Sequence, residues 1–116
     1  MQIEAIRTES LGDTSYVVAH EGHGIIVDPQ RDVGRFLEAV ERLDVMVTHV
    51  VDTHVHNDYL SGAPALAARL GADLVMPAGA GAGFTFVPAF HLEDLKGDGA
   101  LSIRPIHTPG HTPEHT

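Results

Sequence analysis

The chain has 116 residues, no cysteine and no tryptophan, and its 7 basic against 16 acidic side chains give a formal net charge of −9. This length predicts one small domain, and 43% hydrophobic residues exclude an acidic disordered tail. The acidic excess argues against binding to nucleic acid or to an anionic membrane surface, because both need clustered Lys and Arg. The absence of cysteine excludes disulfides, a thiolate zinc site and a cysteine nucleophile.

No apolar run approaches the ~20 residues of a membrane-spanning helix, and the first residues lack the charged-then-apolar pattern of an export signal. We therefore expect a cytoplasmic chain with no membrane partner. One unusual feature of the composition stands out, which is nine histidines in a chain that has no cysteine.

Three strands are expected in the first thirty residues. Residues 2–7 alternate polar and apolar side chains, as a half-buried strand does. Residues 15–19 and 24–27 predict a hairpin across residues 20–23, and Asp28 follows its second strand.

Two helices are expected further along. Apolar side chains at spacings of three and four predict an amphipathic helix over 33–43, with Asp32 as its N-cap. A second helix is expected to have Ser61 as its cap and to end at Gly71. Between the helices, the β-branched run over 45–51 is typical of a central strand that is buried on both faces.

Two more strands are expected after the second helix, a short one over 74–76 and a late one over 101–106, with a Gly- and Ala-rich loop at 78–83 between them. The resulting order is β-β-β-α-β-α-β-β, without an internal repeat or a linker. This order predicts an α/β (α+β) fold in which a mixed sheet carries its helices on one face.

Histidines and a carboxylate follow the predicted central strand, in the run Asp52-Thr53-His54-Val55-His56-Asn57-Asp58-Tyr59. Two histidines at i and i+2 just past a strand end point the same way, so His54 and His56 can reach one ion. Asp58 comes two residues later, where the chain turns toward the next helix. An isolated His-x-His is by itself a weak indication of metal binding.

A second cluster of histidines lies near the C-terminus, in the run His107-Thr108-Pro109-Gly110-His111-Thr112-Pro113-Glu114-His115. Prolines restrict this loop, and Gly110 allows a backbone conformation that brings His111 inward. Imidazole and carboxylate ligands on loops at strand ends suit zinc or non-haem iron. The candidate metal ligands are therefore His54, His56, Asp58 and His111.

Together, the two motifs resemble those of the metallo-β-lactamase-fold superfamily, whose pattern is Thr-His-x-His-x-Asp-His followed downstream by Gly-His-Thr. Within it, the runs around His54 and His111 are most similar to the persulfide dioxygenase (sulfur dioxygenase) branch and the rhodanese-associated proteins near it. The resemblance extends from residue 2 to residue 116. It implies that residues 1–116 form the N-terminal half of an αββα sandwich, without the second half.

The resemblance implies that His54, His56 and His111 occupy the first metal position of the family and that Asp58 occupies the carboxylate position of the second. Tyr59 stands where the family usually has a histidine, and a phenol with a pKa of ~10 is a poor ligand at neutral pH. One ion is therefore favoured over two, Fe(II) before Zn(II). In persulfide dioxygenases two histidines, matching His54 and His111, and a downstream aspartate bind one iron, and this chain has no counterpart of that aspartate.

Three functions follow as hypotheses. The first is a mononuclear iron dioxygenase that oxidises glutathione persulfide or a related thiol, with Asp58 orienting the ligands as a catalytic residue and Tyr59 as a candidate substrate contact. The second is a zinc-dependent thioester or ester hydrolase of the same fold, similar to glyoxalase II. The third is a metal-binding half-domain without activity of its own, which forms a homodimer or associates with the missing C-terminal half.

Other histidines have structural interpretations. His49 lies in the predicted central strand and is expected to be a core histidine with a satisfied hydrogen bond. His20 and His23 fall in the predicted hairpin turn, where exposure to solvent is expected. His91 belongs to no recognisable ligand pattern.

Overall fold

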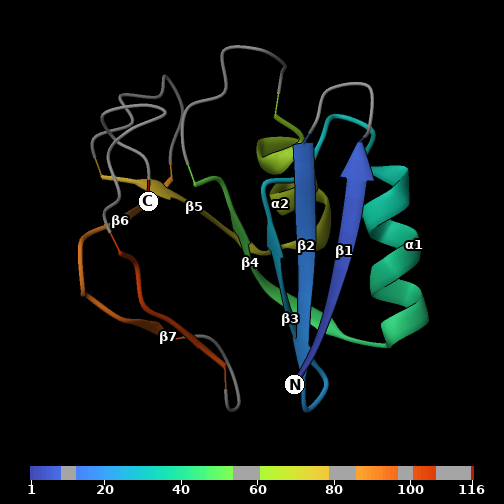
Figure 1. Ribbon diagram of the computed structural model, residues 1–116, viewed down its shortest axis with the longest axis horizontal. Coiled ribbons are helices and arrows are strands. Elements are labelled where there is room, and N and C mark those ends of the chain that lie inside the picture. The colour runs from blue at the N-terminus through green and yellow to red at the C-terminus, as the bar shows by residue number, and fades with distance from the viewer. Residues whose placement is uncertain (9–12, 54–60, 79–85, 97–100, 107–115) are drawn as a thin grey trace.

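The computed structural model describes residues 1–8, 13–53, 61–78, 86–96, 101–106 and 116. Its elements, in chain order, are β1 (Gln2–Thr8), β2 (Asp13–His20), β3 (His23–Val27), α1 (Gly34–Leu43), β4 (Met46–Val51), α2 (Ala63–Leu70), β5 (Asp73–Pro77), β6 (Val87–Ala89), β7 (Leu95–Lys96) and β8 (Ser102–Ile103). The first six strands form one sheet in the order β1-β2-β3-β4-β5-β6, and β7 pairs with β8 in a separate small sheet. Both helices lie on the same side of the large sheet (Figure 1). No helix in the described part of the chain is long and apolar enough to cross a membrane.

The large sheet is mixed, as the sequence predicts. β1, β2 and β3 pair antiparallel, whereas β3, β4, β5 and β6 run parallel. The first two parallel steps are connected through helices, α1 between β3 and β4 and α2 between β4 and β5, because parallel neighbours need a crossover connection. The carboxyl ends of β3, β4 and β5 therefore meet at one end of the sheet, the upper end in Figure 1.

The hydrophobic core lies between the large sheet and the two helices. The strand register places Val17, Ile26 and Val50 in one row across β2, β3 and β4, and all three are 0% exposed. Phe36 of α1 and Leu66 of α2 pack in the same core and are fully buried as well. One face of the sheet and one face of each helix thus share a single core, as their period-2 and period-3.6 patterns predict.

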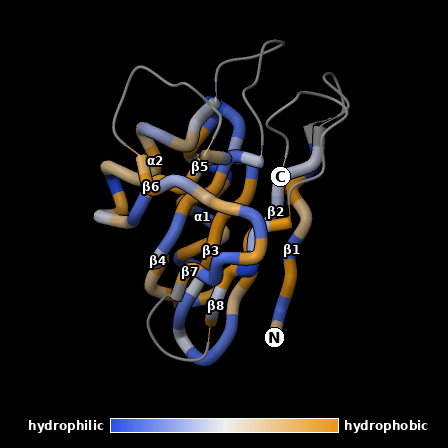
Figure 2. The backbone as a smooth tube through the Cα atoms, turned by 90° about the vertical axis from the view of Figure 1, so that its left-hand side faces the viewer, coloured by the Kyte–Doolittle hydropathy of each residue, from blue (hydrophilic) through white to orange (hydrophobic). Residues whose placement is uncertain are grey.

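The other face of the sheet is less covered at β1 and β2. Ile3 on β1 is 60% exposed, and Tyr16, which lies between the buried Ser15 and Val17 on β2, is 41% exposed. Figure 2 shows hydrophobic and hydrophilic stretches following one another along β1, as expected for a strand with two different faces. The prediction that helices cover only one face is confirmed.

The C-terminal end of α2 agrees with the sequence prediction, whereas the N-terminal end of α1 differs from it. Gly71 ends α2 with a φ of 65°, a left-handed conformation that glycine adopts without steric cost. The N-cap position of α1 is Val33, and no side chain caps this helix. The prediction of Asp32 as N-cap is therefore wrong. Because the helix begins one residue later than predicted, the carboxylate of Asp32 instead lies 3.3 Å from Arg35 Nε.

The C-terminal region differs most from the prediction. The strand predicted over 101–106 is reduced to the two residues of β8, because Pro105 has no backbone N–H with which to extend the pairing. Arg104 beside it donates hydrogen bonds of 2.8 and 3.0 Å from Nε and Nη2 to the carboxylate of Asp94. These hydrogen bonds, together with the negative charge of Asp94, raise the pKa of the Arg104 guanidinium above its ordinary value. Strands β6 and β7 are too short for the sequence pattern to have indicated them.

The structure confirms the prediction for one histidine of the large sheet, His49, and corrects the prediction for His20 and His23. His49 is 5% exposed, and its Nδ1 lies 2.9 Å from Thr48 Oγ1, which confirms a core histidine with a hydrogen bond. His20 and His23 are the last residue pair of the β2–β3 hairpin and do not lie in its turn. The turn consists only of Glu21 and Gly22, with φ values of 48° and 80°, as a two-residue hairpin turn requires.

Candidate metal centre

The residues that the sequence predicts for the site lie outside the described residues; they are His54, His56, Asp58, Tyr59 and His111. They belong to two stretches that we call the first motif segment (residues 54–60) and the second motif segment (residues 107–115). The residues on either side of the first segment, and Thr116 after the second, are described. These neighbours show where each segment adjoins the described part of the fold.

Both motif segments adjoin the carboxyl end of β4. Thr53 directly precedes the first segment, and Thr116 directly follows the second. The backbone N–H of Thr116 donates a 2.7 Å hydrogen bond to the backbone carbonyl of Thr53. One end of each segment therefore lies at the same place in the fold, although the segments are far apart in the sequence. A metal site shared by His54 and His111 needs this proximity.

Asp28 fixes the residue at which the first motif segment begins. Its carboxylate accepts two hydrogen bonds from Thr53, one from the backbone N–H to Oδ1 at 2.8 Å and one from the hydroxyl to Oδ2 at 2.6 Å. The backbone of Asp28 is itself tied to the sheet, because its N–H donates to the Val51 carbonyl at 2.7 Å and its carbonyl accepts from Ser15 Oγ at 2.6 Å. Hydrogen bonds to an ionised carboxylate are stronger than those between neutral groups. Thr53 is thus oriented through both its backbone and its side chain.

Asp52 and Ser61 join the two ends of the first motif segment. Asp52 is 2% exposed, and its Oδ1 accepts a 2.9 Å hydrogen bond from Ser61 Oγ. The same hydroxyl accepts a 3.0 Å hydrogen bond from the backbone N–H of Ala63 in the first turn of α2. The N-cap position of α2 is Gly62, with no side-chain cap, so the prediction of Ser61 as the cap is wrong, although the Ser61 hydroxyl does accept this hydrogen bond from the first turn.

The end of β3 also contacts the residues that follow the first motif segment. The N–H of Gly62 donates a 3.0 Å hydrogen bond to the Pro29 carbonyl, and Gln30 forms an isolated antiparallel bridge with Ser61. A Cβ atom added at position 62 would lie 2.0 Å from the Gln30 carbonyl oxygen. This contact leaves room only for glycine, so the backbone at position 62 packs directly against residues 29 and 30.

The ligands for a metal ion have to come from the motif segments. Within the described ranges, no group of three or more His, Asp or Glu side chains could bind a metal ion. Asp28 and Asp52, which directly follow β3 and β4, instead accept hydrogen bonds from Thr53 and Ser61. The imidazoles and carboxylate of the motif segments are ligands that suit zinc or Fe(II), so the donor chemistry of the chain fits such an ion.

The sequence interpretation did not identify the supporting roles of Asp28, Asp52 and Thr116. A positional signal for the first two was present, because each aspartate directly follows a strand of the predicted sheet. Polar residues at the carboxyl ends of parallel strands are placed where α/β proteins bind ligands. No local pattern could have indicated the contact between Thr116 and Thr53, which depends on the whole fold.

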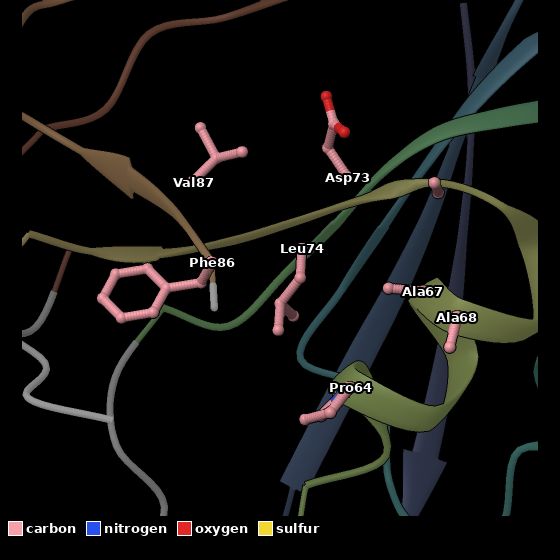
Figure 3. A pocket seen from close by; sticks show the side chains of 8 residues that line it. Pro64, Ala67, Ala68, Asp73, Leu74, Phe86 and Val87 are labelled. Atoms are coloured by element: carbon pink, nitrogen blue, oxygen red, sulfur yellow. The ribbon is translucent and has the colours of Figure 1, made fainter. Parts of the chain in front are cut away.

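A groove with a volume of about 420 Å³ lies between α2, β5 and β6. Figure 3 shows the side chains that line it, namely Pro64, Ala67, Ala68, Ala72, Asp73, Leu74, Phe86 and Val87. Asp73 is the one titratable side chain among these described lining residues. The groove thus lacks the paired titratable groups expected of a catalytic site.

Comparisons with known proteins agree with the motifs and the fold. The metallo-β-lactamase superfamily profile matches residues 11–116. The hydroxyacylglutathione hydrolase of Acidiphilium cryptum is 37% identical over 114 residues, which cover 94% of this chain and 45% of that protein. The structure of ETHE1 from Myxococcus xanthus is 30% identical with a TM-score of 0.90, over 99% of this chain and 52% of that one. A metallo-β-lactamase from Staphylococcus aureus is 27% identical with a TM-score of 0.83, over 99% of this chain and 36% of that one.

The similarity covers nearly all of this chain but only part of each relative. The chain spans about half the length of the hydroxyacylglutathione hydrolase and of ETHE1. What is shared is the mixed sheet with helices on one face, which places the Thr53–Thr116 contact at the carboxyl ends of its parallel strands. On the profile match, the sequence identity and the fold, the chain belongs to the metallo-β-lactamase superfamily.

Proposed function

We propose that this chain is the metal-binding part of an enzyme that acts on the sulfur of a glutathione derivative, and that the reaction is the oxidation of a persulfide by molecular oxygen at one Fe(II) ion. The observation that carries the proposal is the hydrogen bond between Thr116 and Thr53, because it brings together the described neighbours of the two motif segments at the carboxyl end of β4. The motif resemblance to persulfide dioxygenases supports the reaction type.

His54 and His111 are the proposed iron ligands, with His56 lining the site. Bound Fe(II) would supply open coordination positions for oxygen and for the persulfide sulfur. Asp58 is proposed to orient the ligands and Tyr59 to contact the substrate. Asp28 and Asp52 keep the ends of the first motif segment at the carboxyl end of β4.

A second candidate reaction is the hydrolysis of a glutathione thioester with zinc. The observation that favours it is the identity of 37% with a hydroxyacylglutathione hydrolase. Both substrates are derivatives of the glutathione thiol, a persulfide in one case and a thioester in the other, so the substrate class is common to them. Tyr59 distinguishes them, because a two-zinc site would need a further ligand where this chain has a phenol.

The test combines metal analysis with two assays on anaerobically purified protein. The dioxygenase proposal expects one equivalent of iron and oxygen uptake that depends on glutathione persulfide. Two equivalents of zinc without such oxygen uptake would contradict it, and turnover of a hydroxyacylglutathione would then establish the hydrolase. The variant Tyr59→His is the matched control for metal number, because it restores the usual family ligand and should raise the zinc stoichiometry from one toward two.

We further propose that the open face of the large sheet contacts a partner, which is either a second copy of the chain or the complementary half of the sandwich. The support is the exposure of Ile3 and Tyr16 on that face and the match to about half the length of the relatives. A monodisperse monomer of 12.4 kDa in light scattering would contradict the homodimer.

A further inference from the structure

We infer that Asp52, acting through Ser61, is a positioning residue that prepares the first motif segment for metal binding before any metal is bound. The inference rests on the proposed function for the statement that this segment binds metal. It goes further in assigning a role to a buried carboxylate that no predicted ligand set includes. The evidence is the way in which the described residues on both sides of the segment are fixed.

The position of Asp52 is fixed by the sheet. Its backbone N–H donates a 2.9 Å hydrogen bond to the Val75 carbonyl of the neighbouring strand β5, and the residue is 2% exposed. A carboxylate at such a site has a large cost of burial unless hydrogen bonds compensate it. Ser61 Oγ supplies one of these hydrogen bonds at 2.9 Å. This hydrogen bond therefore connects Asp52, at the end of β4, with Ser61, the first residue after the first motif segment.

The hydroxyl of Ser61 has a defined orientation because it makes two hydrogen bonds of opposite sense. It accepts from the Ala63 N–H at 3.0 Å, so its own proton is available for Asp52 Oδ1. An ionised carboxylate can only accept, which matches this arrangement. The start of α2 and the end of β4 are thereby connected through a single side chain.

Both ends of the first motif segment are thus fixed to neighbouring strand ends. Thr53 is fixed by Asp28 after β3, and Ser61 is fixed by Asp52 after β4. Bringing the ends of a flexible loop together has an entropic cost, which grows with loop length. Here hydrogen bonds among the described residues hold both ends of the segment without a metal ion. Preorganisation of this kind increases affinity.

The experiment measures the affinity of the 116-residue chain for Co(II), followed by the visible absorption of the bound ion. Ser61→Ala removes the connecting hydroxyl and is expected to weaken Co(II) binding by about tenfold or more, the usual effect of losing a residue that orients metal ligands. Asp52→Asn retains an oxygen that can accept from Ser61 and should restore most of the affinity that Asp52→Ala loses. Thr48→Ala is the matched control, because it removes a β4 hydroxyl whose partners are the Gly24 carbonyl at 3.4 Å and His49 Nδ1 at 2.9 Å, away from this end of the strand.

Hydrogen exchange of the metal-free protein distinguishes a failure of the inference from a failure of the proposed function. Ser61→Ala should accelerate exchange at residues 53–61 and leave β2 and β3 unchanged, whether or not the ion is iron. Unchanged exchange at these residues, or unchanged Co(II) affinity in Ser61→Ala and Asp52→Ala, would overturn the inference. Faster exchange together with Co(II) binding that does not depend on His54 and His111 would instead refute the proposed function. If Asp52→Ala does not fold, the milder Ser61→Ala still decides the question.

Discussion

The two faces of the large sheet contain similar side chains in very different surroundings. On the helix side, Val17 and Ile26 are completely buried, whereas on the other side Ile3 and Tyr16 are 60% and 41% exposed. These residues lie on paired neighbouring strands, so residue type and local structure do not explain the difference. What differs is the presence of α1 and α2. The stability of this chain therefore depends mainly on the helix-covered face.

The largest expected effect comes from the centre of the helix-covered face. Phe36→Ala removes a fully buried ring from the core and should lower the free energy of unfolding by about 3–5 kcal/mol. Phe90→Ala is the matched control, because Phe90 is 49% exposed and its loss should cost less than about 1 kcal/mol. Urea denaturation followed by circular dichroism measures both. Similar costs for the two variants would contradict the one-sided core.

A sharper comparison uses two adjacent valines on β2. Val17 is 0% exposed on the helix side, and Val18 points to the other face, where it is half-buried. Val17→Ala should cost roughly 2–3 kcal/mol, because burial of the lost methyl groups and the cavity that remains both contribute. Val18→Ala should cost less than half as much. The order of the two midpoints in urea tests this directly, and a reversed order would mean that the open face carries the core.

Polar contacts stabilise the carboxyl ends of the parallel strands. A substitution at Asp28 tests how much these contacts contribute to the free energy of unfolding. Asp28→Asn keeps a residue type that tolerates the φ of 52° but loses one of the two acceptors for Thr53. We expect a loss of roughly 1–2 kcal/mol of stability. Denaturant unfolding of the metal-free protein gives the value. Glu38→Gln, an exposed position on α1, is the control and should leave the stability unchanged.

The fold could be predicted from the sequence more fully than the site, and the reasons are physical. Hydrophobic periodicity reports which side chain faces a core, and it indicated the strand at 45–51 and the helix at 33–43 to within one residue. Periodicity does not show which residue occupies the N-cap position, and for this reason the prediction of Asp32 as the cap of α1 was wrong. The ligand residues were predicted from a motif, and that prediction still stands untested because these residues lie outside the described ranges. The contact between Thr116 and Thr53 could not be read from local pattern at all, since it depends on the complete topology.

A smaller effect on stability, but a clear one on association, is expected on the open face. Ile3→Lys introduces a charge at a position that is 60% exposed, so the stability of the single chain should change by no more than about 0.5 kcal/mol. If a second copy covers this face, the same charge should lower the average mass in light scattering toward that of a monomer. The control is Met46→Lys, another exposed apolar position, at the opposite end of the sheet from the motif segments. Equal dissociation in both variants would contradict a specific contact through Ile3.

The smallest expected effect is that of the ion pair between Glu4 of β1 and Arg42 of α1. The hydrogen bond to Glu4 and the charge of that carboxylate raise the pKa of Arg42 above its ordinary value. A cation with a raised pKa contributes its stability at neutral pH and loses it only when the pH rises through that pKa, so mild alkali should not weaken the pair. Salt should weaken it, because the Debye length falls from about 10 Å at 0.1 M to about 3 Å at 1 M ionic strength. Glu4→Gln should therefore lower the unfolding midpoint slightly at low salt and not at 1 M salt. An equal loss at both salt concentrations would show that Glu4 stabilises the covered face through packing and not through its charge.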